Sequence, residues 1–167
     1  MSLAQHSLAQ HQNGWAIIAS FLVAMMLTLM PLPDGAEWFR PEWVAMVLIY
    51  WCMALPERVN IGVAWIMGLF LDVARGALLG QYALTLTLVA FLTIHLHRRV
   101  RNFPLWQQSL AVLVLVALEQ LLVLWVKGII GQSPNNWLYW APSLTSMLLW
   151  PWMFLVLRDL RRHFRVT

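Results

Sequence analysis

The chain has 167 residues, of which 61% are hydrophobic and only 11% are charged. Soluble domains carry roughly a quarter charged residues, so this composition excludes an ordinary water-exposed surface and predicts lipid as the solvent. The net charge of +4 does not indicate nucleic acid binding, because the basic residues cluster at the ends of apolar segments rather than among aromatic residues on one face.

The length allows about six membrane-spanning helices, because each needs about 20 mostly apolar residues. No room is then left for a soluble domain. Cys52 is the single cysteine, so a disulfide framework within the chain is excluded. No positively charged segment precedes the first apolar run, and Met30-Pro31 follows it rather than a small-residue cleavage site. We therefore expect this segment to stay in the mature protein.

The apolar segments predict an all-α, polytopic membrane bundle. Runs such as residues 111–116 are continuously apolar, whereas a transmembrane barrel requires alternation, and an open sheet would leave backbone groups unpaired in hydrocarbon. The predicted helices lie near residues 15–30, 41–55, 59–74, 77–96, 105–126 and 138–157. They form one transmembrane domain, residues 15–157, between an N-terminal tail of residues 1–14 and a basic C-terminal tail of residues 158–167.

The second and third segments are short for a membrane of about 30 Å of hydrocarbon. They form either two short spans, the second helix beginning at Pro41, or a re-entrant hairpin that enters and leaves on one face. Residues 56–60, at the tip, include Glu57 and Arg58. Because an arginine at the bilayer centre is costly, two short spans are favoured.

Arginine and lysine residues predict the orientation. With the N-terminus inside, the cytoplasmic side receives eight of them, at positions 58, 98, 99, 101, 158, 161, 162 and 165, and the outer side receives only Arg40, Arg75 and Lys127. This asymmetry satisfies the positive-inside rule and places both termini in the cytoplasm. The basic C-terminal residues are expected to hold this topology, contact anionic lipid headgroups, or meet a cytoplasmic partner.

Glu119 lies inside an apolar segment, in the outer half of the predicted membrane. A carboxylate there is costly unless it is paired or protonated, so it marks a structural or functional contact. We expect Glu119 and Arg75 to approach each other within the bundle. The alternatives are a neutral Glu119 bonded through Gln120 or Thr87 backbone groups, a contact used by a partner, and a proton or ion relay.

Gly68, Asp72, Gly76 and Gly80 recur every four residues. Small residues at this spacing allow close helix packing in membranes. The pattern crosses a predicted helix end, so the later glycines alternatively shape a turn. Asp72 and Arg75, three residues apart, are expected to form an ion pair of small value at the helix end.

The sequence contains no enzyme signature that we recognise, and a non-enzymatic protein without cofactors is expected. Asp72 and Glu119 could meet as a carboxylate pair, but no catalytic motif surrounds either. His95 and His97 are two residues apart, which places them on different faces of a helix, so they do not predict a metal site. Anchoring at the interface beside the neighbouring arginines is the expected role.

Several motifs in order resemble the family of the rod shape-determining protein MreD, in its proteobacterial form. They are Phe39-Arg40-Pro41-x-Trp43, Tyr50-Trp51, Ala54-Leu55-Pro56-x-Arg58-Val59-Asn60-x-Gly62, Gly68-x-x-Leu71-Asp72-x-x-x-Gly76-x-x-Leu79-Gly80, Leu105-Trp106-Gln107-Gln108 and Trp150-Pro151-Trp152. The resemblance extends from about residue 14 to the end of the chain.

This resemblance implies a role in the machinery that builds the lateral peptidoglycan wall of rod-shaped bacteria, at the inner membrane. It implies binding to the single membrane helix of MreC, and indirect association with the MreB filament, with RodA and with its partner transpeptidase. It also implies a fold similar to the S-components of energy-coupling-factor transporters. Catalytic residues are not established for the family, so none are carried over.

From these patterns we hypothesise a membrane scaffold whose segment from Arg40 to Gly80 forms much of the docking face for the MreC helix. The positions expected to shape this interface, or to act as polar groups within the membrane, are Arg40, Arg58, Asn60, Gly68, Asp72, Arg75, Gly76, Gly80 and Glu119. The alternative is a membrane subunit that binds a small ligand in an outward-facing cavity near Glu119, Arg75 and Tyr82.

Overall fold

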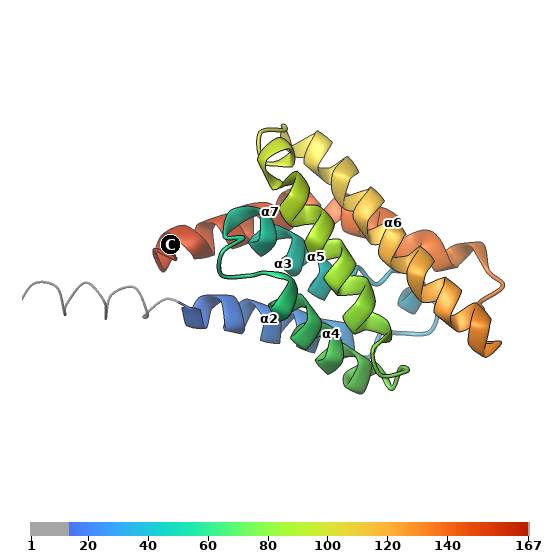
Figure 1. Cartoon of the computed structure of the whole chain (residues 1–167). Coiled ribbons are helices and arrows are strands. Elements are labelled where there is room, and N and C mark those ends of the chain that lie inside the picture. Colours follow the sequence, from blue (N-terminus) through green and yellow to red (C-terminus); the bar gives the residue numbers. More distant parts are fainter. Residues whose placement is uncertain (1–13, 167) are drawn as a thin grey trace, which may run out of the picture.

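The computed structural model describes residues 14–166, and all the regular secondary structure in this range is helical (Figure 1). The α-helices are α2 (Gly14–Leu29), α3 (Trp43–Ala54), α4 (Ile61–Arg75), α5 (Gln81–Val100), α6 (Leu105–Ile130) and α7 (Ala141–His163). Two short 3-10 helices, η1 (Ala36–Phe39) and η2 (Trp137–Trp140), precede α3 and α7. The predicted all-α bundle of six helices is confirmed.

Helix α3 lies at the centre of the bundle. All ten residues from Val44 to Met53 are buried, although the helix has only 12 residues. It contacts α2, α5, α6 and α7, so neighbours surround it on all sides. A helix that is apolar all round is the type that packs inside other helices, which explains why α3 shows no polar face.

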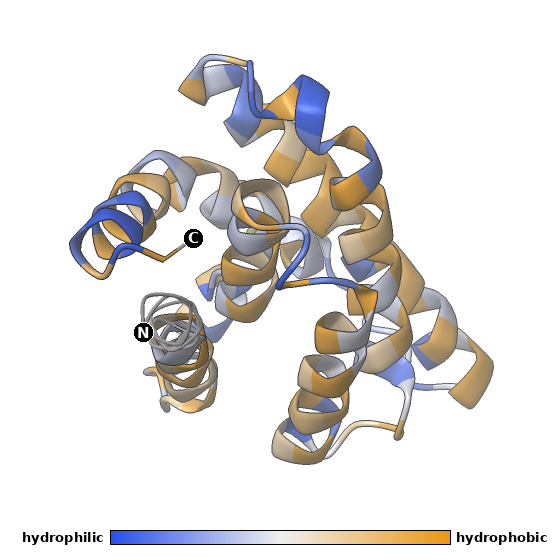
Figure 2. Ribbon diagram, turned by 60° about the vertical axis from the view of Figure 1, so that its left-hand side comes forward, coloured by the Kyte–Doolittle hydropathy of each residue, from blue (hydrophilic) through white to orange (hydrophobic). Residues whose placement is uncertain are grey.

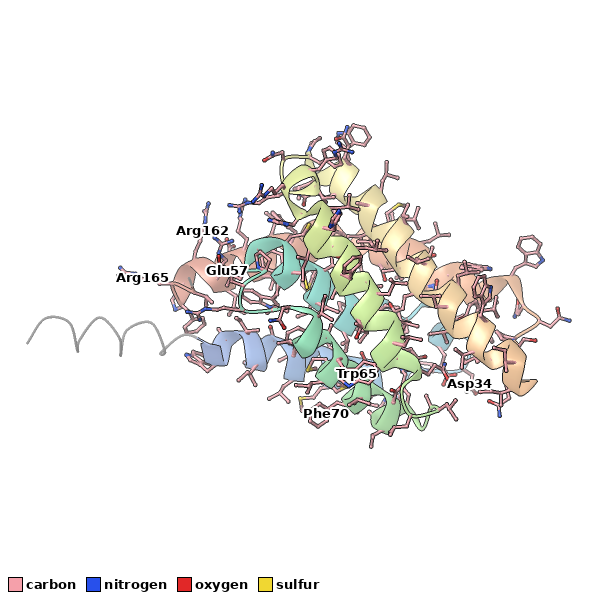
Figure 3. The ribbon with its side chains drawn as sticks, in the orientation of Figure 1. Asp34, Glu57, Trp65, Phe70, Arg162 and Arg165 are labelled. Carbon is pink, nitrogen blue, oxygen red and sulfur yellow. The ribbon has the colours of Figure 1, made fainter. Side chains whose placement is uncertain are left out.

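Successive helices run back and forth between two ends of the bundle (Figure 1). At one end, the last turn of α3 lines a small cavity with Arg101, Arg158 and Arg161. Figure 3 shows Glu57, Arg162 and Arg165 at this same end, and Asp34 at the opposite one. We call these the basic end and the opposite end. Figure 2 shows hydrophilic residues gathered near the C-terminus and in loops, with mostly hydrophobic residues along the helices between them.

Helices α3 and α4 follow each other in the chain and run in opposite directions. The turn of residues 55–60 joins them at the basic end, and the other ends of both helices line a cavity at the opposite end. Two helices, Leu105–Ile130 and the segment Trp137–His163, are long and apolar enough by themselves to cross a membrane, and Gly14–Leu29 is a shorter apolar helix.

Several predicted boundaries were wrong by a few residues. The fourth helix begins at Gln81 rather than at residue 77, because Gly76 and Gly80 have positive φ angles of 62° and 98° and form the turn before it. The second helix begins at Trp43 rather than at Pro41. The last helix continues to His163, so most of the predicted basic tail is helical. The predicted N-terminal tail falls almost wholly outside the described residues.

Helices α4 and α5 pack closely against each other at Gly68. A Cβ atom on Gly68 would lie 2.2 Å from the Ala83 Cα atom and 2.6 Å from the Ala83 nitrogen. Only glycine allows the two backbones to approach this closely. Gly68 therefore serves packing within the chain and does not lie on an outer docking face.

We predict that Gly68→Ala destabilises the protein strongly, by roughly 2–4 kcal/mol, because the methyl group would push the α5 backbone away from α4. The measurement is thermal unfolding of the purified protein in detergent. Gly128→Ala is the matched control, because Gly128 is also helical but has no atom within 4 Å of its added Cβ. Equal melting temperatures for the two variants would contradict this account of the α4–α5 contact.

Candidate functional site

A polar cavity of about 360 Å³ opens at the opposite end of the bundle. Charged, aromatic and amide side chains converge on it from four parts of the chain. They come from the segment before α3, the facing ends of α4 and α5, the half of α6 that contains Glu119 and Lys127, and η2. The lining residues are Glu37, Trp38, Arg40, Glu42, Arg75, Tyr82, Glu119, Gln120, Val123, Lys127, Tyr139 and Pro142.

Arg75 lines this cavity and contacts two of its other lining residues. Its guanidinium group forms an ion pair with Glu42 at 3.0 Å and donates a hydrogen bond to the Tyr82 hydroxyl at 2.8 Å. The same guanidinium lies 4.8 Å from the centre of the Tyr82 ring, a cation–π distance. Both partners of the ion pair are largely buried, with side chains 21% and 13% exposed, so Arg75 ties the end of α4 to the start of α3.

Glu119 and Arg75 line the same cavity, as the sequence analysis expected, but Glu42 rather than Glu119 is the ion-pair partner of Arg75. Glu119 is 1% exposed, and neither of its carboxylate oxygens has a hydrogen-bond partner among the described residues. The alternative of bonding through Gln120 or Thr87 backbone groups is therefore not seen. The sequence did not single out Glu42 as the partner, because Glu42 and Arg75 are 33 residues apart in the chain.

Asp72 has a different role from the expected ion pair with Arg75. It is fully buried, and its carboxylate accepts hydrogen bonds from the backbone nitrogens of Gly80 at 2.8 Å, Tyr82 at 2.7 Å and Ala83 at 3.4 Å. These donors are at the N-terminal end of α5. The N-cap residue of α5 is Gly80, which has no side chain that could form a capping hydrogen bond. Asp72 therefore caps α5 from the neighbouring helix α4.

Two other predicted positions also satisfy backbone groups at helix ends. Arg40 donates to the carbonyl oxygens of Thr28 at 2.5 Å and Met30 at 2.6 Å, next to the C-terminus of α2. Asn60 is the N-cap of α4, and its side-chain oxygen accepts from the nitrogens of Gly62 and Val63. These contacts position the loops at the two ends of the bundle.

The motifs around Gln108 and Trp150 meet inside the bundle. The Trp150 indole nitrogen lies 3.5 Å from the Gln108 side-chain oxygen, and both residues are buried. Pro151 follows inside α7, where it removes one helical hydrogen bond. The contact joins the first turn of α6 to the middle of α7.

An apolar groove of about 730 Å³ separates α2 from α4, and sequence reasoning did not anticipate it. Nearly all of its lining side chains are apolar, and Arg58 is the charged residue among them. Exposed apolar residues on both helices border it, including Ile18, Leu22 and Phe70, which are 62%, 59% and 60% exposed. Figure 3 shows Trp65 and Phe70 on the outer side of α4. No sequence pattern could have located this groove, because it depends on how far apart two helices lie.

Helices that are apolar on their outer faces, joined by short loops and carrying polar groups inside the bundle, define this chain as a membrane-associated helical protein. The comparisons identify which kind. The profile of the family described as rod shape-determining protein MreD matches residues 9–160. The rod shape-determining protein MreD of Haemophilus influenzae is 34% identical over 152 residues, which cover 91% of this chain and 94% of that protein. The chain belongs to the MreD family.

No solved structure matches the chain. The expected likeness to the S-components of energy-coupling-factor transporters is therefore without support. The role of the protein in cell shape rests on the family alone, and the site must be interpreted from its own geometry.

We predict that Asp72→Ala lowers stability by roughly 3 kcal/mol, because it leaves buried backbone N–H groups of α5 without an acceptor. Thermal unfolding in detergent provides the measurement. Asp159→Ala is the control, because the Asp159 side chain is exposed and its ion pair with Arg158 is long, at 4.0 Å. This substitution should change stability by less than about 0.5 kcal/mol. A melting temperature of the Asp72→Ala variant equal to that of the wild-type protein would exclude the capping role.

Proposed function

We propose that the protein is a non-enzymatic scaffold of the wall elongation machinery at the bacterial inner membrane, and that it binds the single membrane helix of MreC. Membership of the MreD family supports a role in maintaining rod shape. The observation that carries the binding proposal is the apolar groove between α2 and α4. Association with the MreB filament, with RodA and with its partner transpeptidase would follow through MreC.

The groove is suited to a helix because of its shape rather than its hydrophobicity. Exposed apolar side chains are already satisfied by lipid, so apolar character alone gives no drive for association. A helix seated between α2 and α4 would gain close van der Waals contacts on two sides, which flexible lipid chains fill less well. The docking face proposed from the sequence is therefore revised. It still includes the outer side of α4, it now includes α2, and it no longer includes Gly68.

We further propose that all six helices span the membrane with both termini in the cytoplasm. The basic end carries Arg101, Arg158 and Arg161 together, which satisfies the positive-inside rule when this end faces the cytoplasm. The short helix α3 is tolerated because it is enclosed by other helices of the protein.

Cysteine labelling in intact spheroplasts tests this orientation. In a Cys52→Ala background, a cysteine at Asp34 should react with a membrane-impermeant maleimide, whereas one at Glu57 should react only after permeabilisation. Both positions are in loops, at opposite ends of the bundle (Figure 3). Labelling of the Glu57 position from outside would reverse the proposed topology.

Site-directed photo-crosslinking tests the groove. A photo-reactive residue at Leu22 or Phe70 should cross-link to MreC at least fivefold more efficiently than one at Val114 or Leu148. The control positions on α6 and α7 are 66% and 74% exposed, comparable to those in the groove. Cross-linking confined to the α6–α7 positions would show that MreC binds elsewhere.

A further inference from the structure

The polar cavity contains three buried hydrogen-bond acceptors without donors. They are both carboxylate oxygens of Glu119 and the side-chain oxygen of Gln120, which follows it on α6. Burying a carboxylate without a partner is expensive, and buried polar atoms in proteins nearly always have one. Three adjacent acceptors therefore point to a missing donor.

Two neighbouring side chains do not supply this donor, because their polar groups already have partners. Arg75 binds Glu42 and Tyr82. Gln120 is held by two bonds with Tyr139, donating its amide nitrogen to the Tyr139 carbonyl at 3.0 Å and accepting the Tyr139 hydroxyl at its own backbone carbonyl at 2.7 Å. The second acceptor is thus fixed in the cavity and does not turn away.

Lys127 also lines the cavity, and its positive charge is opposite to that of the Glu119 carboxylate. Its ammonium group is 5.9 Å from the centre of the Tyr139 ring, and no ion pair joins it to an acidic group in the described residues. Lys127 lies eight residues after Glu119 on α6, about 12 Å further along the axis, so the two side chains present separate charges. The unpaired acceptors and the Lys127 ammonium group lie at different positions along α6, and both line one cavity.

We propose that this cavity binds a small zwitterionic group, with an N–H-donating ammonium at Glu119 and Gln120 and an anionic group at Lys127. The volume of about 360 Å³ suits a headgroup-sized ligand. A phosphoethanolamine moiety has this chemistry, whether it belongs to a lipid headgroup or to a soluble molecule. The site is distinct from the α2–α4 groove, so it does not depend on MreC binding.

The experiment compares probes that differ only in the ammonium. Glycerophosphoethanolamine and glycerophosphocholine carry the same charges, but the choline nitrogen has no N–H group. At about ten times the dissociation constant, the first probe should raise the melting temperature of the wild-type protein by roughly 3–6 °C, and the second by much less. Nanodiscs of phosphatidylethanolamine and of phosphatidylcholine, each mixed with phosphatidylglycerol, provide the lipid arm.

Stabilisation by the soluble probe assigns the site to a free ligand as well as a lipid, whereas stabilisation by phosphatidylethanolamine alone assigns it to a lipid headgroup; either result supports the proposal. Glu119→Gln should abolish the difference between the ethanolamine and choline forms, and Lys127→Gln should weaken it. Glu57→Gln makes the same charge change at the basic end and should preserve it.

Equal effects of the ethanolamine and choline forms, no effect of either, or an unchanged preference in Glu119→Gln would overturn the proposal. Because Glu119→Gln removes an unpaired buried charge, this variant should fold at least as well as the wild type. Cross-linking to MreC from Phe70 in the same variant separates failure of this site from failure of the proposed scaffold function.

Discussion

The burial of α3 on every side is the constraint around which the rest of the bundle is arranged. A helix of 12 residues reaches only about 18 Å, too short to cross hydrocarbon when exposed to lipid. Enclosed by α2, α5, α6 and α7, it meets no lipid, and its short length leaves space above its N-terminus. The polar cavity lies in that space, since Glu42 is the N-cap residue of α3 and lines it. The short length of the buried helix α3 thus leaves room for the polar cavity and its charged lining residues.

Charged residues at this end divide into those that hold the fold and those that are left over. Asp72 caps α5 and Arg40 bonds to the carbonyl groups that end α2, so these charges are used to close helix ends. Arg75 joins α3 to α4 through Glu42. Among the described residues, neither Glu119 nor Lys127 forms an ion pair, although Glu119 is as deeply buried as the residues of the core. The unpaired groups, rather than the ion pair, are therefore where a ligand would be recognised.

The two proposed binding surfaces rely on different physics. The groove between α2 and α4 is apolar and faces sideways, where only shape can distinguish a protein helix from lipid. The cavity is polar and lies at one end, where hydrogen bonding and charge decide. A scaffold with both surfaces could hold a partner helix through one and respond to its surroundings through the other.

The sequence by itself determined that the chain is a helical bundle, approximately where its helices lie, and which family it belongs to, because apolar segment length and the order of motifs are local properties. It also singled out Glu119, Arg75, Asp72 and Gly68 as unusual. Only the tertiary structure decided their partners: Arg75 pairs with Glu42, 33 positions away in sequence, Asp72 caps α5, and Gly68 receives the α5 backbone. Partner choice depends on distances between helices, and the hydrophobic pattern of a chain that is apolar along most of its length carries little information about those distances.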